Sequence, residues 1–109
     1  NIETWAPIQK YDVVFSMETF YYFKNPYKII EKIYNTVLNK NGIIIIGIDH
    51  YLENKEALNW GKEFNLNITT LSIEVWKNIF QNVGFKKITC KQVEKKELWK
   101  GTLIIKGEK

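Results

Sequence analysis

The sequence predicts an α/β fold whose mixed sheet has two parallel strands followed by a carboxyl-terminal antiparallel hairpin, with flanking helices. Three observations favour this class. An apolar run at 13–15 is soon followed by a helix-start signal, four consecutive isoleucines come after a helix stop, and a charged stretch separates two final strand-like segments. A chain of 109 residues is long enough for one core, so we expect a single domain.

The first strand is predicted around Val13–Phe15, where continuous apolarity favours burial on both faces. The exposed residues Ser16 to Glu18 come directly after it, at the carboxyl end of the strand. An aromatic turn at 20–23 then leads to Asn25 and Pro26. Asn is a favoured N-cap and Pro suits the first helical position, so a helix is expected to begin there.

An apolar stripe predicts the helix that begins at Pro26, and a glycine marks the boundary between this helix and the second strand. The stripe consists of Ile29, Ile30, Ile33, Tyr34, Val37 and Leu38. Asn41 and Gly42 are expected to end the helix, with Gly42 in the left-handed conformation. Ile43–Ile46 then predicts a central strand covered on both faces. A right-handed parallel crossover would place the strand ends at Ser16 and Asp49 on one edge of the sheet.

The segment 51–70 has weak periodicity and is predicted to be a cover over the end of the second strand. It is aromatic and lacks the Ser, Gly and Pro content of a linker. Asn54 is expected to cap a short helix that runs to Trp60 and ends at Gly61.

The last third of the chain predicts one helix and two strands. Ser72 is a good N-cap, and Gly84 is expected to stop the helix that begins there. Strands are predicted at Lys87–Val93 and Thr102–Ile105, the second ended by Gly107. The charged stretch between them favours an antiparallel hairpin.

Composition narrows the functional classes. Every basic residue is Lys, and the lysines are dispersed along a chain of net charge +4, so nucleic-acid binding is not expected. The longest purely apolar run, Ile43–Ile46, is far too short to cross a membrane. No signal peptide is visible, and the single cysteine, Cys90, cannot form an internal disulfide, which favours the cytoplasm. One His and one Cys provide no structural zinc set, so no metal site is predicted.

Several segments, in this order and spacing, resemble the carboxyl-terminal half of a class I S-adenosylmethionine-dependent methyltransferase, a Rossmann-like domain. The matching residues are Tyr11–Glu18, Asn25-Pro26, Leu38–Gly42 with the isoleucine strand, the Trp76, Phe80, Gly84-Phe85 helix end and Gly101–Ile105. The resemblance covers nearly the whole chain. It implies the fourth to seventh strands of a seven-stranded sheet, with the last strand antiparallel beside the fifth.

The same resemblance implies that residues 1–109 are the carboxyl-terminal part of a single methyltransferase domain whose amino-terminal cofactor-binding half is absent. The six glycines are isolated, and no glycine-rich turn occurs. We expect a fragment of an enzyme, inactive alone, whose whole protein methylates a small-molecule acceptor. Two alternatives remain open: a non-catalytic interaction module that self-associates through its open sheet edge, and another nucleotide-binding Rossmann-like enzyme.

The cofactor-binding residues implied by the resemblance are Met17, Ser16, Asn1 and Ile2. Met17 matches the position after the fourth strand that touches S-adenosylmethionine in the family, and its thioether is polarizable. A core methionine is the alternative. Ser16 is a neighbouring contact or only a polar strand end. Asn1 and Ile2 match the segment that borders the adenine, with Asn in place of the more usual Asp.

The aromatic turn is expected to line the substrate pocket. Tyr21 and Tyr22 are the candidates, since Phe20 and Phe23 are expected to pack under the following helix. Trp60 on the cover segment is expected to close over the substrate, or simply to anchor that segment. Aromatic rings can exclude water and surround a cation.

His50 follows the second predicted strand, between Asp49 and Tyr51. A neutral imidazole there could remove a proton from the acceptor, so His50 is the candidate catalytic residue. The alternative is an exposed loop histidine. Asp49 is expected to orient His50 or to bind a substrate cation, and Tyr51 is a candidate substrate contact.

Overall fold

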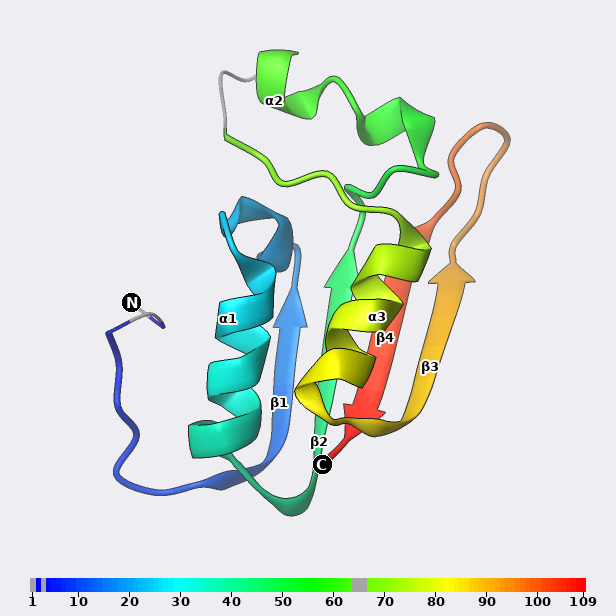
Figure 1. Cartoon of the computed structure of the whole chain (residues 1–109). Coiled ribbons are helices and arrows are strands. Elements are labelled where there is room, and N and C mark those ends of the chain that lie inside the picture. Colours follow the sequence, from blue (N-terminus) through cyan, green and yellow to red (C-terminus); the bar gives the residue numbers. More distant parts are fainter. Residues whose placement is uncertain (1, 3, 64–66) are drawn as a thin grey trace.

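The computed structural model describes residues 2, 4–63 and 67–109, and its centre is one four-stranded sheet (Figure 1). The strands are β1 (Tyr11–Met17), β2 (Leu38–Ile48), β3 (Lys86–Val93) and β4 (Thr102–Glu108), and their order across the sheet is β1-β2-β4-β3. β1 is parallel to β2, whereas β4 is antiparallel to both of its neighbours. The predicted mixed sheet, with two parallel strands and a final hairpin, is confirmed.

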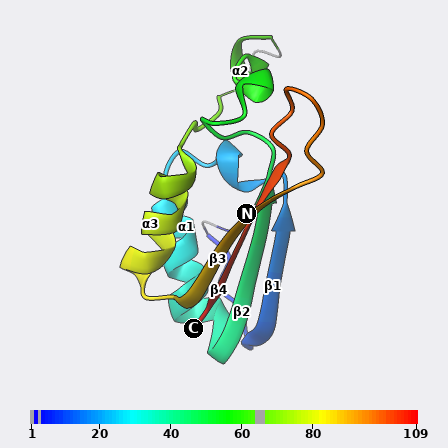
Figure 2. The same ribbon diagram turned by 90° about the vertical axis from the view of Figure 1, so that its right-hand side faces the viewer.

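The helices form one layer. α1 (Pro26–Lys32) continues into a π-helical turn, η2 (Ile33–Val37), and α3 (Ile73–Val83) packs beside α1. Both long helices lie on the same face of the sheet, as the two views in Figures 1 and 2 show. Three shorter pieces lie towards the carboxyl end of β2: η1 (Phe20–Tyr22), η3 (Lys55–Ala57) and α2 (Trp60–Glu63).

The helix ends predicted from capping residues are confirmed at three places. Asn25 Oδ1 accepts a hydrogen bond from the Lys28 N–H (3.3 Å), and Ser72 Oγ accepts one from the Val75 N–H (3.1 Å). Each satisfies a donor that has no partner inside its helix. Gly84 ends α3 with φ 121°, a backbone conformation that other residues rarely adopt.

The first long helix ends earlier than predicted. Helical structure stops at Val37, because Leu38 already pairs with Tyr11 at the start of β2. Asn41, not Gly42, takes the left-handed conformation (φ 67°), which asparagine tolerates better than most residues. Glycine is needed at position 42 for a different reason, which is lack of space. A Cβ there would lie only 2.7 Å from the Asn39 carbonyl oxygen.

Three further local predictions are wrong. The Asn54 side chain does not cap η3 but bonds elsewhere, and Gly61 lies inside α2 rather than at a helix end. β4 also extends past Gly107 to Glu108. That glycine packs against the Phe85 ring, to which a Cβ would approach within 3.0 Å, so it marks close packing instead of a strand end.

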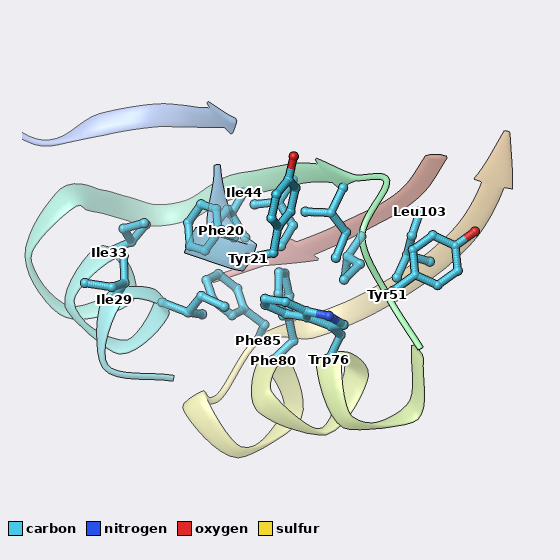
Figure 3. Packing of buried hydrophobic residues seen from close by; sticks show 14 of the residues in the cluster. Phe20, Tyr21, Ile29, Ile33, Ile44, Tyr51, Trp76, Phe80, Phe85 and Leu103 are labelled. Carbon is cyan, nitrogen blue, oxygen red and sulfur yellow. The ribbon is translucent and has the colours of Figure 1, made fainter. Parts of the chain in front are cut away.

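The core lies between the sheet and the α1–α3 layer (Figure 3). Ile44, Ile46 and Ile48 of β2 are fully buried there, in one cluster with Trp76 and Phe80 of α3. The predicted cover on both faces of the isoleucine strand is wrong for the described residues. The alternate side chains are only partly buried, because no helix in this part of the chain lies over the second face.

The second face of the sheet is apolar along β1. Val13, Phe15 and Met17 are 58%, 65% and 41% exposed, respectively. The outer edge of β1 also has no partner strand among the described residues. Among the residues that the structure describes, no helix is both long and apolar enough to cross a bilayer.

Candidate functional site at the carboxyl ends of β1 and β2

The ends of the two parallel strands lie side by side. Ser16 pairs with Ile46 and Met17 with Gly47, and the Glu18 N–H continues the ladder by donating to the Gly47 carbonyl (2.7 Å). The prediction that the strand ends share one edge of the sheet is therefore confirmed. Such an edge is where open α/β sheets bind their ligands.

Glu18 joins the two strand ends. Its Oε2 accepts hydrogen bonds from the Tyr21 hydroxyl (2.8 Å) and from the Asp49 N–H (3.2 Å). Its backbone is left-handed, with φ 58°. Partial burial raises the pKa of the Glu18 carboxyl above its usual range, and repulsion from Asp49 adds to this effect, while the bond from Tyr21 opposes it. Sequence reasoning noted Glu18 only as an exposed residue, because neither hydrogen bond has a signature in the sequence.

Aromatic rings from four separate segments meet above this edge, and we call Tyr21, Tyr22, His50, Trp60 and Trp99 the aromatic wall. The centroid of Tyr21 lies 4.6 Å from that of Tyr22, 5.7 Å from that of His50 and 6.2 Å from that of Trp60. Trp60 stacks on Trp99 at 6.2 Å. The structure thus brings together three of the predicted substrate residues and the predicted catalytic one.

The wall differs from the predicted site in two respects. Tyr21 is buried, whereas Tyr22 remains largely exposed. Burial and the hydrogen bond to Glu18 raise the pKa of the Tyr21 phenol far above its ordinary value, so it stays neutral. Trp99 was missed, because only the β3–β4 hairpin brings it to Trp60.

His50 is buried, at 1% exposure, so the alternative of an exposed loop histidine is wrong. Its Nδ1 lies 2.8 Å from the Ala57 carbonyl oxygen, which can only accept, so Nδ1 carries the proton. Its Nε2 lies 2.6 Å from the Thr70 hydroxyl. Burial lowers the pKa of the imidazole. Both ring nitrogens are engaged within the chain, and the catalytic role of His50 stays a prediction.

Tyr51 is fully buried, and its hydroxyl lies 3.0 Å and 2.8 Å from the carbonyl oxygens of Lys100 and Gly101. Gln92 Nε2 donates to the same hydroxyl (3.2 Å). In this structure Tyr51 therefore anchors the cover segment to the β3–β4 hairpin. Its expected contact with substrate remains a prediction.

Asn54, also fully buried, makes a second anchor. Its Nδ2 donates to the Asp49 carbonyl (2.9 Å), and its Oδ1 accepts from the Lys100 N–H (3.1 Å). Asp49 in turn accepts a hydrogen bond from the Thr102 hydroxyl (2.5 Å), so it does not contact His50 through any recorded bond. Asn54 therefore ties the start of the cover segment to the end of β2 and to the β3–β4 hairpin.

Asn1 falls outside the described residues, and the other predicted cofactor residues lie on β1, as Ser16 and Met17 do, or near it, as Ile2 does. Ile2 is partly buried, and its carbonyl accepts a hydrogen bond from Lys32 Nζ (2.8 Å). Ile2 and Ser16 both line an apolar hollow of about 210 Å³ between β1 and α1. Met17 projects onto the opposite, uncovered face beside Gly47. The described residues contain no group of three His, Cys, Asp or Glu side chains that could hold a metal ion.

A scan against protein-family models finds no match for this chain, and neither does a search of curated proteins. Solved structures do match. One is a complex of the Haloferax volcanii Trm112 methyltransferase activator with a methyltransferase. The match has 20% identity and a TM-score of 0.77, and it covers 91% of this chain and 54% of the matched chain. An S-adenosylmethionine-dependent methyltransferase of Thermotoga maritima matches with 20% identity and TM-score 0.74, covering 89% and 55%.

A third match is the N-methyltransferase NodS of Bradyrhizobium japonicum in complex with S-adenosyl-L-homocysteine. The two chains share 13% identity, and the TM-score is 0.68. The match covers 99% of this chain and 50% of the NodS chain. At such identities the comparisons establish the fold, which is that of the carboxyl-terminal part of methyltransferase domains. The chain spans about half the length of these three structures.

Proposed function

We propose that this chain is part of an S-adenosylmethionine-dependent methyltransferase. The observation that carries the proposal is the joined pair of strand ends, with Met17 and Glu18 at the end of β1 and Asp49 directly after β2, beside an aromatic wall. It supports a ligand site because it lies at the edge where open α/β sheets bind ligands. The methyltransferase structures with the same fold support the choice of chemistry.

Met17, Ser16, Ile2 and Asn1 form this chain's share of the cofactor site. Met17 offers a polarizable sulfur on the uncovered face of the sheet, whereas Ser16 and Ile2 line the apolar hollow between β1 and α1 on the other face. When bound, S-adenosylmethionine supplies an electrophilic methyl group.

The aromatic wall faces the methyl acceptor, a small molecule. Tyr21, Tyr22 and Trp60 of the wall are on the substrate side, together with Tyr51, which lies outside the wall. Holding the acceptor in line with the methyl group supplies most of the acceleration, because two reactants are kept in one geometry. His50 either accepts the acceptor's proton after breaking its bond to Thr70, or keeps the cover segment in place. Activity of a His50→Gln variant separates these roles, since only the first predicts a changed pH profile of kcat.

We further propose that residues 1–109 are the carboxyl-terminal part of one domain and that an amino-terminal half completes the pocket. Three features support this. The outer edge of β1 is unpaired within the described residues, the second sheet face is apolar, and the chain covers only 54% and 55% of two matched structures. The isolated chain is then inactive, because it has no glycine-rich turn for the cofactor. The absence of paired cysteines favours a cytoplasmic enzyme.

The same open edge and apolar face favour a second candidate, a non-catalytic module that self-associates. Titration calorimetry of the full-length protein with S-adenosylmethionine decides between them. Binding is expected for the methyltransferase, and the Met17→Ala variant should lose more affinity than Tyr22→Ala. Absence of binding, together with concentration-dependent dimers in sedimentation, would favour the module.

A further inference from the structure

We propose that Glu18 makes the site selective for the cationic sulfonium of S-adenosylmethionine over the neutral thioether of S-adenosylhomocysteine. This inference rests on the proposed function and assigns a specificity role to a residue that the resemblance left without one. Glu18 is the neighbour of Met17, the expected cofactor contact, at the end of β1. Its carboxylate lies between the ends of β1 and β2, at the edge of the sheet to which the proposed function assigns the cofactor.

The carboxylate of Glu18 is held in one place. Oε2 accepts from a side chain, the Tyr21 hydroxyl, and from a backbone group, the Asp49 N–H. The backbone of Glu18 is also fixed, because its N–H bonds to Gly47. Oε1 has no hydrogen bond within the described residues. A charge fixed in this way needs little reorganisation when a cation arrives.

No positive charge of the described residues compensates Glu18. The single ion pair recorded there joins Lys87 and Glu108, at the opposite end of the sheet. The groups that face Glu18 are Tyr21 from η1, whose raised pKa keeps it neutral, and Asp49 directly after β2, which is acidic. His50, behind Tyr21, is neutral near pH 7 because burial lowers its pKa. The electrostatic potential around the Glu18 carboxylate is therefore negative.

Two features at Glu18 oppose folding. Its φ of 58° is unfavourable for a residue with a Cβ, and glycine would remove that strain. Partial burial also disfavours its charged form. Local strain of this kind is characteristic of functional sites, where it is retained for a role in binding or catalysis.

The two forms of the cofactor differ at one atom. During transfer the bond between sulfur and methyl carbon breaks, its electron pair stays on sulfur, and the methyl carbon bonds to the acceptor. The sulfonium thus becomes a neutral thioether while every other charged group of the cofactor is unchanged. A fixed carboxylate several ångströms away in a partly desolvated site favours the cation by about threefold to tenfold. The neutral product, S-adenosylhomocysteine, is bound less tightly by the same factor and is therefore released more readily.

The test is titration calorimetry of the full-length protein with S-adenosylmethionine and with S-adenosylhomocysteine, reported as the ratio of the two Kd values. Glu18→Gln keeps an oxygen that can accept both hydrogen bonds but removes the charge. We expect it to shift the ratio by about threefold or more towards S-adenosylhomocysteine. The matched control is Glu56→Gln, an exposed carboxylate on η3 with no recorded contact, which should leave the ratio unchanged.

The outcomes separate the two proposals. If the wild-type protein binds neither compound, the proposed function fails. If it binds both and Glu18→Gln leaves the ratio unchanged, or Glu56→Gln shifts it equally, the role of Glu18 is refuted. Should Glu18→Gln not fold, Glu18→Gly removes the same charge and relieves the backbone strain at φ 58°. It should shift the ratio in the same direction, and an unchanged ratio would overturn the inference.

Discussion

The Met17 side chain occupies the space that a Cβ on Gly47 would need. The two residues are register partners on β1 and β2, and the Met17 sulfur lies directly over the glycine. A Cβ at position 47 would lie 2.7 Å from Met17 Cε and 3.0 Å from Ile104 Cδ1. The absence of a side chain at one strand end therefore sets the position of the thioether at the other.

Gly47→Ala is expected to displace Met17 and weaken the binding of S-adenosylmethionine to the full-length protein several-fold. It should also lower the free energy of unfolding by about 1–3 kcal/mol, because the extra methyl overpacks the strand pair. Gly42→Ala is the matched control at the other end of β2, where a Cβ would meet the Asn39 carbonyl oxygen at 2.7 Å. The control should lose stability while keeping cofactor affinity, as calorimetry and thermal unfolding can show. Equal losses of affinity in the two variants would argue that Gly47 does not position the Met17 side chain for cofactor binding.

His50 should make stability depend on pH. Its pKa is lowered in the folded protein, so the folded state binds the proton more weakly than the unfolded state does. The stability associated with neutral His50 is therefore present above the ordinary pKa of about 6.5 and is lost as the pH falls below it. Denaturant unfolding at a series of pH values should show a steeper decline between about pH 7 and pH 5 for wild type than for His50→Gln. Parallel curves would contradict this.

Asn54→Ala should loosen the cover segment. It removes the acceptor of the Lys100 N–H and the donor to the Asp49 carbonyl, and both losses occur at a fully buried position. We expect a loss of about 1–3 kcal/mol in the free energy of unfolding. Hydrogen exchange at the Lys100 amide should accelerate. The exposed Asn59, changed to alanine, provides the control, and an effect of the same size there would show that these two bonds are unimportant.

Phe15→Lys tests whether an amino-terminal half covers the second face of the sheet. Phe15 is 65% exposed in the described chain, so lysine would be tolerated if that face stayed open. In the full-length protein we expect a loss of several kcal/mol, because a buried, unpaired ammonium is strongly unfavourable. Leu98→Lys, on the exposed β3–β4 hairpin, should change the thermal midpoint little. Similar midpoints for the two variants would count against a covered face.

Local signals in the sequence were sufficient wherever one residue and its near neighbours decide the outcome. The caps at Asn25 and Ser72, the stop at Gly84 and the isoleucine strand all depend on hydrogen bonds or periodicity within a few residues. The parallel pairing of β1 with β2 followed from the short connection between these strands. Local signals misplaced the end of the first helix, because the pairing of Leu38 with Tyr11 competes with helix continuation.

The sequence by itself determined the class of fold, the edge on which the strand ends meet and the residue types available there. Only the tertiary structure decided which of those side chains are committed to one another. The bridge from Glu18 to Asp49, the stacking of Trp60 on Trp99 and the burial of His50 join segments far apart in the chain. Such contacts depend on how whole elements pack, and no spacing along a single segment encodes them.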